Sequence, residues 1–357
     1  MSTVTRLFSL LSQEQGTAAV IHNESNIFYL SQGYTGEGCL FLTPTVSYIV
    51  TDFRYVEQAA RQSPGFSIKE TTHDCTQNSW LAALCKEHGI TKLYYEDDTL
   101  TVRQRDALRT SLPASVELLS IAEKPETLRR IKTADEIRAI REACRITSET
   151  FSLILPKIRE GVTEKELKLE LEFTQMKLGA QGNSFDPIVA SGINGSLPHA
   201  IPSDKRLEKG DLITLDFGCK VDNYCSDMTR TVSLGTPSPE MRRIYDTVFT
   251  AQAMGVEALK PGMICKAVDK VCRDYIDSQG YEGRFGHGLG HSLGIDIHEN
   301  PRLSPTCADL VETGMLLTVE PGIYVPGLGG VRIEDTCLVT ETGSEPLTTA
   351  PKELIIL

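Results

Sequence analysis

The sequence predicts an α+β protein of two domains, in which a small α/β domain precedes a larger domain with an internal repeat. The length of 357 residues exceeds the roughly 250–300 residues at which a single core stops growing. Residues 1–122 alternate short apolar runs with turn residues, and residues 133–357 contain two similar halves. Pro125 and a shift to charged residues mark residues 123–132 as a linker.

The first domain is expected to combine strands and helices. Apolar or β-branched runs bounded by turn residues predict strands, and they lie at residues 16–22, 27–33, 38–44, 46–52 and 92–97. Residues 79–89 predict a helix that ends at Gly89. This mixture is typical of a small α/β domain.

The larger domain begins with a long helix and continues with the repeat. Thr133 and Glu136 offer a capping box, and apolar residues then recur at helical spacing up to Ile154. Further on, residues 159–182 and 260–283 align without a gap. Each of these two units reads as a helix end, a glycine turn, a second helix and a glycine stop.

A pair of acidic strands follows each unit of the repeat. "LITLDFG" and "SDMTRTV" follow the first unit, and "LLTVEPG" and "RIEDTCL" follow the second. Because side chains alternate along a strand, each carboxylate shares a face with a threonine. The carboxylates at equivalent places are Asp216, Asp227, Glu320 and Glu334. They converge if the two halves pack about a pseudo-two-fold axis.

Such a carboxylate cluster requires positive charge, because buried carboxylates repel one another and carry a large desolvation cost. Two divalent cations would neutralise four carboxylates. Ligation by carboxylates with one histidine favours Mn²⁺, with Co²⁺, Fe²⁺ and Zn²⁺ as alternatives. The segment "FGHGLGHSLGIDIHENP" supplies histidines on glycine-rich backbone that can approach a crowded cluster. Spacing alone does not separate His287 from His291 as the ligand.

Several motifs together resemble the M24 metallopeptidases, in the branch of Xaa-Pro aminopeptidases (aminopeptidase P) and Xaa-Pro dipeptidases (prolidases). The motifs are "SGINGSLPHA", "LDFGCKVDNYCSDMTRT", "FGHGLGHSLGIDIHENPRLS", "TVEPGIYVPGLGGVRIEDT", "NIFYLSQG" and "TDFRYVEQA". They span nearly the whole chain. The resemblance implies a C-terminal pita-bread fold at residues 133–357 and a creatinase-like α/β domain at residues 1–122.

The resemblance also implies the ligands of two metal ions, namely Asp216, Asp227, His291, Glu320 and Glu334. By this likeness Asp227 and Glu334 bridge the metals and Asp216 chelates one of them. His291 and Glu320 hold the other metal.

Three further histidines are implied to line the pocket without ligating a metal. His199 and His298 orient the peptide and stabilise the tetrahedral intermediate, and His287 lines the substrate side. Glu320 is implied as the proton shuttle. The reaction is hydrolysis of the peptide bond before proline, whose nitrogen is a tertiary amide without N–H.

Strand alternation adds three candidates around the ligands. Thr229 and Thr336 are placed to hold Asp227 and Glu334 through hydrogen bonds, although β-propensity alone also explains a threonine in a strand. Arg332 shares a face with Glu334, and a charge on an inward face needs a partner.

The resemblance leaves the specificity open. Arg302 resembles the arginine with which prolidases hold the free carboxylate after proline, but a surface loop charge explains it equally. We expect a broad Xaa-Pro aminopeptidase, with a dipeptidase as the alternative. Methionine aminopeptidases usually lack a domain like residues 1–122, and creatinase-type relatives lack the complete ligand set. A non-catalytic peptide- or protein-binding module is a remote alternative.

Composition and charge restrict the partners. The net charge of −12 is spread along the chain, which weighs against nucleic acid and anionic membranes. We find no apolar run near the ~20 residues of a membrane span. The N-terminus does not read as a signal peptide, and the ten cysteines show no C-x-x-C pair, which predicts a cytoplasmic protein. The resemblance implies a homodimer in which the N-terminal domain shapes or covers the partner's site.

Overall fold

The computed structural model describes residues 2–11 and 14–357. The chain divides into two compact units, Met1–Arg129 and Arg130–Leu357. This division falls inside the segment 123–132 that the sequence suggests as a linker. Most of that segment is helical, because it contains α6 (Lys124–Arg129).

The first unit is built on a six-stranded mixed sheet in the order β4-β3-β2-β1-β5-β6. β1, β2 and β3 pair antiparallel, whereas β4, β5 and β6 join the sheet through parallel pairs. Its elements are α1 (Thr3–Leu10), β1 (Thr17–Ile21), α2 (Glu24–Ser31), β2 (Cys39–Leu42), β3 (Ser47–Asp52), α3 (Val56–Gln62), β4 (Ser67–Thr71), α4 (Gln77–Glu87), β5 (Lys92–Tyr95), α5 (Val102–Ser111), β6 (Glu117–Ser120) and α6.

One element of this unit differs from the sequence-based expectation. Residues 27–33 are not a strand, since most of them belong to α2. Asn23 caps this helix, because its side chain accepts a hydrogen bond from the Asn26 N–H. Ile27 and Leu30 are buried on it. A short apolar run fits a buried helix as well as a strand, and here the cap favours the helix.

The second unit carries the repeat. Its elements are α7 (Ala134–Ile154), η1 (Leu155–Lys157), α8 (Glu164–Lys177), β7 (Gly182–Asn183), β8 (Ile188–Ser191), η2 (Gly192–Ser196), β9 (Leu212–Phe217), β10 (Cys219–Val221), β11 (Tyr224–Cys225), β12 (Met228–Ser233), α9 (Pro239–Ala258), α10 (Cys265–Ile276), η3 (Asp277–Tyr281), β13 (Gly290–Ser292), β14 (Glu299–Leu303), β15 (Leu316–Val319), β16 (Gly322–Val325), β17 (Gly329–Arg332), β18 (Asp335–Val339) and β19 (Ser344–Pro346).

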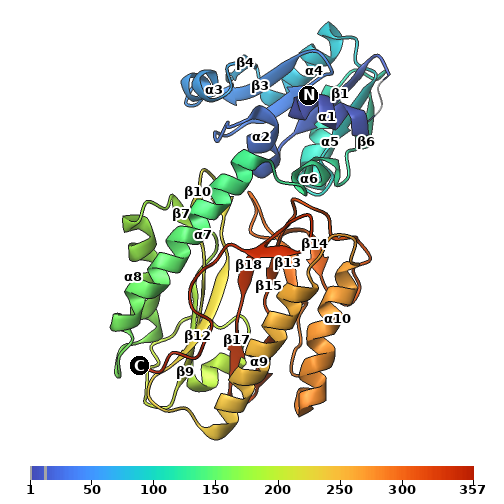
Figure 1. Cartoon of the computed structure of the whole chain (residues 1–357). Helices are drawn as coiled ribbons and strands as arrows, with labels where there is room; N and C mark the ends of the chain where they lie inside the picture. Colours follow the sequence, from blue (N-terminus) through green and yellow to red (C-terminus); the bar gives the residue numbers. More distant parts are fainter. Residues whose placement is uncertain (1, 12–13) are drawn as a thin grey trace. The chain divides into compact units, whose positions relative to one another are not determined.

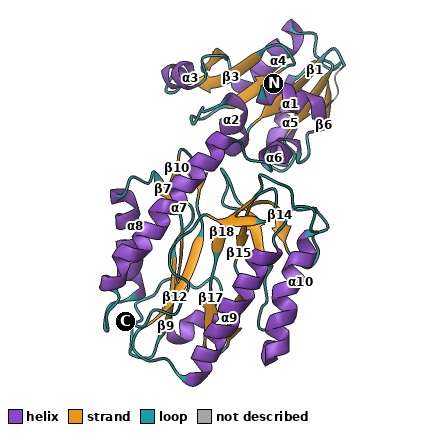
Figure 2. Ribbon diagram, viewed as in Figure 1, coloured by secondary structure: helices purple, strands orange, loops and turns teal. Residues whose placement is uncertain are grey.

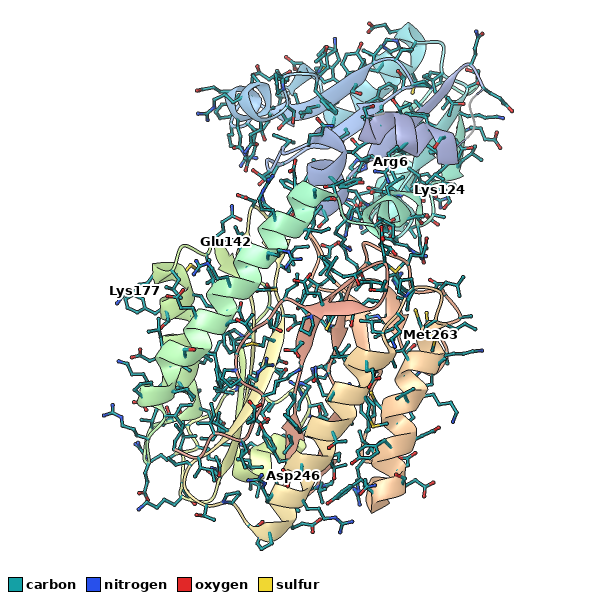
Figure 3. The ribbon with its side chains drawn as sticks, viewed as in Figure 1. Arg6, Lys124, Glu142, Lys177, Asp246 and Met263 are labelled. Atoms are coloured by element: carbon teal, nitrogen blue, oxygen red, sulfur yellow. The ribbon has the colours of Figure 1, made fainter. Side chains whose placement is uncertain are left out.

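The two halves of this unit have corresponding parts. Helices α7 and α8 lie on one side of the central strands and α9 and α10 on the other (Figure 1). The strands form two principal sheets, β12-β9-β8 and β14-β13-β15-β18-β19, drawn in orange in Figure 2. Charged side chains such as Glu142 on α7 and Asp246 on α9 lie on the outer faces of the helices (Figure 3).

Glycines mark equivalent turns in the two halves. Gly161 and Gly262 have φ of 86° and 83°, and Gly179 and Gly280 have φ of 103° and 90°. An added Cβ at these positions would meet nothing within 4 Å. The requirement is therefore the left-handed conformation and not space, which confirms the predicted glycine turns and stops.

Strand alternation turns the acids away from the two cores. In β9 the side chains of Ile213, Leu215 and Phe217 join an apolar core with α7 and α8. In β15 Leu317 and Val319 join the core of the second half. The alternate positions of each strand, which include Asp216, face the other way. The predicted antiparallel strand pairs are confirmed as β9 with β12 and β15 with β18.

Candidate metal centre

The four duplicated carboxylates lie where strands of the two halves meet. Asp216 lies in β9 and is paired with Thr229 of β12, and Asp227 precedes β12. Glu320 follows β15, and Glu334 precedes β18. The Glu334 N–H donates to the Thr229 carbonyl oxygen at 3.1 Å, so the two halves are hydrogen-bonded beside the acids.

All four carboxylates border one cavity of 610 Å³ in the second unit. Most of the other candidates from the sequence lie around it too. The candidate residues that line the cavity are His199, Asp216, Asp227, His287, His291, His298, Arg302, Glu320, Arg332 and Glu334. Thr229 and Thr336 lie behind this wall, fully buried.

Three donor atoms lie close enough to hold one ion. Side-chain atoms of Asp227, His291 and Glu334 all lie within 4.8 Å of one another, and all three residues are buried. Glu320 extends the group, since its Oε1 lies 3.4 Å from the His291 Nε2. The structure therefore brings together ligand candidates from both halves of the repeat.

The orientation of His291 suits a cation. Its Nδ1 lies 3.1 Å from the carbonyl oxygen of Ser292 and donates a hydrogen bond to it. The Nε2 of this tautomer has a lone pair, which faces Asp227 at 3.5 Å and Glu320 at 3.4 Å. Burial lowers the pKa of His291 to about 3, with the neighbouring His298 adding to the shift. A neutral nitrogen that faces two carboxylates is a favourable place for a cation.

The electrostatics of the acids lead to the same conclusion. Burial, followed by repulsion from neighbouring carboxylates, raises the pKa of Asp227 and of Glu334 well above the usual range. Burial raises the pKa of Glu320 to about 8. One oxygen of Asp216 and one of Asp227 are buried without a hydrogen-bond partner. These residues fit divalent metal ions, which would neutralise the charge and satisfy the two orphaned oxygens.

Glycine allows the histidine strand to approach this cluster. A Cβ at Gly290 would lie 2.0 Å from the Thr318 carbonyl oxygen, so any larger residue would push β13 away from β15. The Thr318 hydroxyl accepts the His291 N–H at 3.0 Å and donates to the Glu320 Oε1 at 3.2 Å. The sequence suggested glycine for its close approach, and this contact gives the reason.

Arg332 and the two threonines contact the acids in different ways. Arg332 donates to Asp216 Oδ2 at 2.6 Å and to the Thr229 hydroxyl at 3.1 Å. Thr229 donates to Glu334 Oε2 at 2.7 Å. Thr336 instead donates to the backbone carbonyl of Asp227 at 2.8 Å. Thr229 in the first half thus bonds a carboxylate of the second half, whereas Thr336 bonds a backbone carbonyl of the first half.

Tyr324 is a residue that the sequence reasoning missed. Arg332 Nη1 donates to its hydroxyl at 2.9 Å, and the hydroxyl donates to His287 Nε2 at 2.9 Å. The His287 Nδ1 in turn donates to the Gly288 carbonyl at 2.8 Å. Burial, with Arg332 nearby, lowers the pKa of His287 to about 4. A tyrosine in a strand is ordinary β-propensity, so no signal in one sequence distinguishes this one.

The remaining candidates lie on the exposed side of the cavity. The imidazole ring of His298 lies edge-on to that of His291, with ring centroids 4.5 Å apart. Arg302 of β14 is the direct cross-strand partner of His291 of β13. His199 lies on the segment after η2, and all three residues are exposed to solvent. These groups are accessible to a peptide that enters the cavity.

Comparison with known proteins identifies the family. Residues 138–341 match metallopeptidase family M24, and residues 4–131 match the creatinase/prolidase N-terminal domain. The chain belongs to metallopeptidase family M24. The predicted family, fold and enzyme class are thereby confirmed. Divalent metal is the cofactor of this family of metallopeptidases.

This M24 peptidase is similar along its length to solved structures. An Xaa-Pro dipeptidase from Bacillus anthracis is 42% identical, covers 99% of both chains and has a TM-score of 0.96. An X-Pro aminopeptidase from Thermotoga maritima is 33% identical, covers 99% of this chain and 100% of that chain, and has a TM-score of 0.91. The Xaa-Pro dipeptidase of Pyrococcus furiosus is 44% identical over 67% of this chain and 69% of its own length.

The substrate of this M24 peptidase is a peptide. Among the described residues we find no helix of the length and apolarity that a membrane span requires.

Proposed function

We propose that this M24 peptidase hydrolyses Xaa-Pro dipeptides with two divalent metal ions. The observation that carries the proposal is the position of Arg302, a cation on the rim of the cavity and directly across the strand pair from His291. Such a cation suits the free carboxylate of a C-terminal proline. The likeness to the Bacillus anthracis Xaa-Pro dipeptidase over 99% of both chains supports the same choice.

The proposed ligands are Asp216, Asp227, His291, Glu320 and Glu334. We assign Asp227 and Glu334 to both metals, Asp216 to one metal, and His291 with Glu320 to the other. The burial of these groups and the two orphaned carboxylate oxygens support the assignment. We propose Mn²⁺ as the metal, since four carboxylates with one imidazole make a predominantly hard donor set.

The metal ions would lower the pKa of an attacking water and polarise the scissile carbonyl. Glu320 accepts the proton of that water, because it borders the cavity with 17% of its side chain exposed. It then passes the proton to the proline nitrogen, which leaves as an amine.

The histidines act on the peptide. His199 and His298, exposed at the cavity, donate hydrogen bonds to the substrate and to the developing oxyanion. His287 is held by Tyr324 and the Gly288 carbonyl, and its Nδ1 lies 4.0 Å from Glu320 Oε2. In this position it lines the substrate side beside the proton acceptor.

An Xaa-Pro aminopeptidase is the second candidate function, and the one we expected from the sequence. The likeness to the Thermotoga maritima X-Pro aminopeptidase supports this candidate. The dipeptidase alternative is favoured because it is the activity named for the Bacillus anthracis and Pyrococcus furiosus proteins.

Hydrolysis of Xaa-Pro and Xaa-Pro-Yaa peptides of the same first residue separates the two candidates. We expect the dipeptide to be cleaved with a kcat/KM at least about tenfold higher, and Arg302→Met to remove that preference mainly through KM. Arg159→Met, at an exposed arginine that does not line the cavity, is the control. Equal cleavage of both peptides would favour the aminopeptidase.

A homodimer and a cytoplasmic location stay predictions from the sequence. Light scattering during size-exclusion chromatography measures the molar mass of the protein and so tests the homodimer prediction. All ten cysteines are free, and eight of them are buried, which is consistent with a reducing compartment.

A further inference from the structure

Outside the candidate metal centre, the second unit holds a buried carboxylate that forms no ion pair with a cation among the described residues. Glu164, the first residue of α8, has 0% exposure. Its two oxygens accept hydrogen bonds only from a set of short polar groups. These bonds come from Ser191 N (2.7 Å), Ser191 Oγ (2.8 Å), Asn194 Nδ2 (3.1 and 3.2 Å), Ser203 N (3.0 Å) and Ser203 Oγ (2.7 Å).

These donors lie at the two ends of one segment. Ser191 is the last residue of β8, Asn194 lies in η2, and Ser203 follows Pro202. Residues 192–202 between them carry His199. The neighbours Pro198 and Ile201 line the cavity with it. We call residues 192–202 the His199 loop.

The His199 loop has little core of its own to hold it. Ile193 is 60% exposed and Ile201 is 87% exposed. The loop is held instead where Gly195 packs against the backbone of Gly330 in β17, and by the polar contacts at its two ends. Further along it, Arg332 Nη1 donates to the Pro198 carbonyl at 3.3 Å. The Glu164 carboxylate bonds both ends of the loop, at Ser191 and at Ser203. Lys205 also contacts both serines, but through two separate groups, its ammonium and its backbone N–H.

The chemistry of Glu164 suits this task. A buried carboxylate is costly unless hydrogen bonds satisfy it, and each donor here is a backbone N–H or a short side chain of fixed reach. The ammonium of Lys205 donates to the Ser191 hydroxyl at 3.0 Å and pairs with Asp211 at 2.6 Å. The Glu164 charge is thus satisfied by the loop ends themselves, and a shift of either end would break several bonds together.

We propose that Glu164 is a positioning residue for peptide hydrolysis, which fixes the His199 loop and so holds His199 against the cavity. The kinetic part rests on the proposed function, because it assigns His199 to the peptide. Glu164 lies apart from the metal ligands in this assignment, so its loss leaves the metal content unchanged.

The test is Glu164→Gln in the full-length, metal-loaded protein. The glutamine amide has the shape of the carboxylate, but its NH₂ group needs acceptors. At this site it would instead face the donors of Ser191, Asn194 and Ser203. We expect KM for Ala-Pro to rise about tenfold with a smaller fall in kcat. The metal-to-protein ratio should equal that of the wild type. Glu170→Gln is the matched control, since Glu170 lies on the same helix with 45% of its side chain exposed. An unchanged KM in Glu164→Gln would overturn the proposal.

A double-mutant cycle separates positioning from general damage. If Glu164 acts through His199, then Glu164→Gln has no further effect on kcat/KM in a His199→Ala background, to within about twofold. If the two substitutions instead lower kcat/KM independently, so that the double variant shows the product of the two single effects, Glu164 does not act through His199. If Glu164→Gln does not fold, Ser203→Ala removes only the loop-side hydroxyl, and we expect KM to rise about threefold.

Hydrogen–deuterium exchange gives a readout that needs no substrate. In Glu164→Gln we expect faster exchange in residues 192–203 and unchanged exchange in β9 and β12. Unchanged exchange of the loop would refute the anchoring itself. If the wild type cleaves no Xaa-Pro peptide, the proposed function is wrong. The exchange measurement still tests whether Glu164 fixes the His199 loop, because it needs no substrate.

Discussion

His291 directs its unprotonated Nε2 at the carboxylate of Glu320, 3.4 Å away, while its Nδ1 donates to the Ser292 carbonyl. Two acceptors facing each other at this distance repel unless a metal ion, or a proton on the carboxyl group, lies between them. The residues come from neighbouring strands, β13 and the end of β15, that are joined through the Thr318 hydroxyl. This relationship is the basis for the predictions that follow.

Removal of the metal should make stability depend on pH. Burial raises the pKa of Glu320 to about 8 and raises those of Asp227 and Glu334. The folded metal-free chain therefore binds protons that the unfolded chain releases above about pH 4.5. Its stability falls as pH rises from about 5 to about 8. We expect the Tm of the metal-free protein to be at least about 5 °C lower at pH 8 than at pH 5.5.

Calorimetry of the metal-loaded protein over the same pH range is the comparison, because bound cations keep these carboxylates ionised. The loaded protein should show a smaller fall in Tm. A metal-free protein that gains stability towards pH 8 would show that the acids are not buried together.

The two threonines should differ in their effect on the metal. Thr229→Val removes a hydroxyl that donates to the Glu334 carboxylate, and we expect the metal Kd to rise about 10–100-fold. Thr336→Val removes a bond to the Asp227 backbone carbonyl, so the rise should be smaller. Titration calorimetry with Mn²⁺ measures both, with Thr247→Val on α9 as the control. Equal losses in Thr229→Val and Thr336→Val would refute this distinction.

Tyr324→Phe should impair catalysis without loss of metal. The variant leaves His287 Nε2 and Arg332 Nη1 without the hydroxyl between them. We expect kcat/KM to fall about tenfold at saturating metal, since buried polar groups are left unsatisfied. Tyr281→Phe, whose hydroxyl bonds Glu240 away from the cavity, serves as control. If Tyr324→Phe has the kcat/KM of the wild type, the Tyr324 hydroxyl has no role in catalysis.

Lys132→Met should destabilise the second unit. Lys132 pairs with Glu299 at 3.0 Å, and the two side chains are only 2% and 6% exposed. Removal of one charge of a buried ion pair costs about 3–5 kcal/mol of unfolding free energy. Chemical denaturation measures the loss, and Lys132→Met with Glu299→Gln should recover part of it. A double variant less stable than Lys132→Met would contradict this account.

Much of the metal centre was predictable because it repeats. The strand pairs carry their acids on alternate positions, and duplication in the second half indicated which acids to group as ligand candidates. The capping box of Thr133 and Glu136 likewise placed the start of α7, and both of its hydrogen bonds form.

Other features could not be read from one sequence. Residues 27–31 lie in a helix that Asn23 caps, and an apolar run of that length fits either structure. Glu164 and Tyr324 act through partners that lie far from them in the chain, as in the 27-residue separation between Glu164 and Ser191. Thr229 and Thr336 occupy equivalent positions, so only three-dimensional contacts distinguish a bond to a carboxylate from a bond to a carbonyl.

The most direct test of the account is metal content in Asp227→Asn. Wild type and variant are loaded with Mn²⁺, desalted and measured by plasma mass spectrometry, with Asp246→Asn as the exposed control. We predict about two ions per chain in the wild type and the control, and fewer than one in Asp227→Asn with an unchanged circular dichroism spectrum. A folded Asp227→Asn variant that retains the full complement of metal would contradict the assignment of these carboxylates to a metal centre.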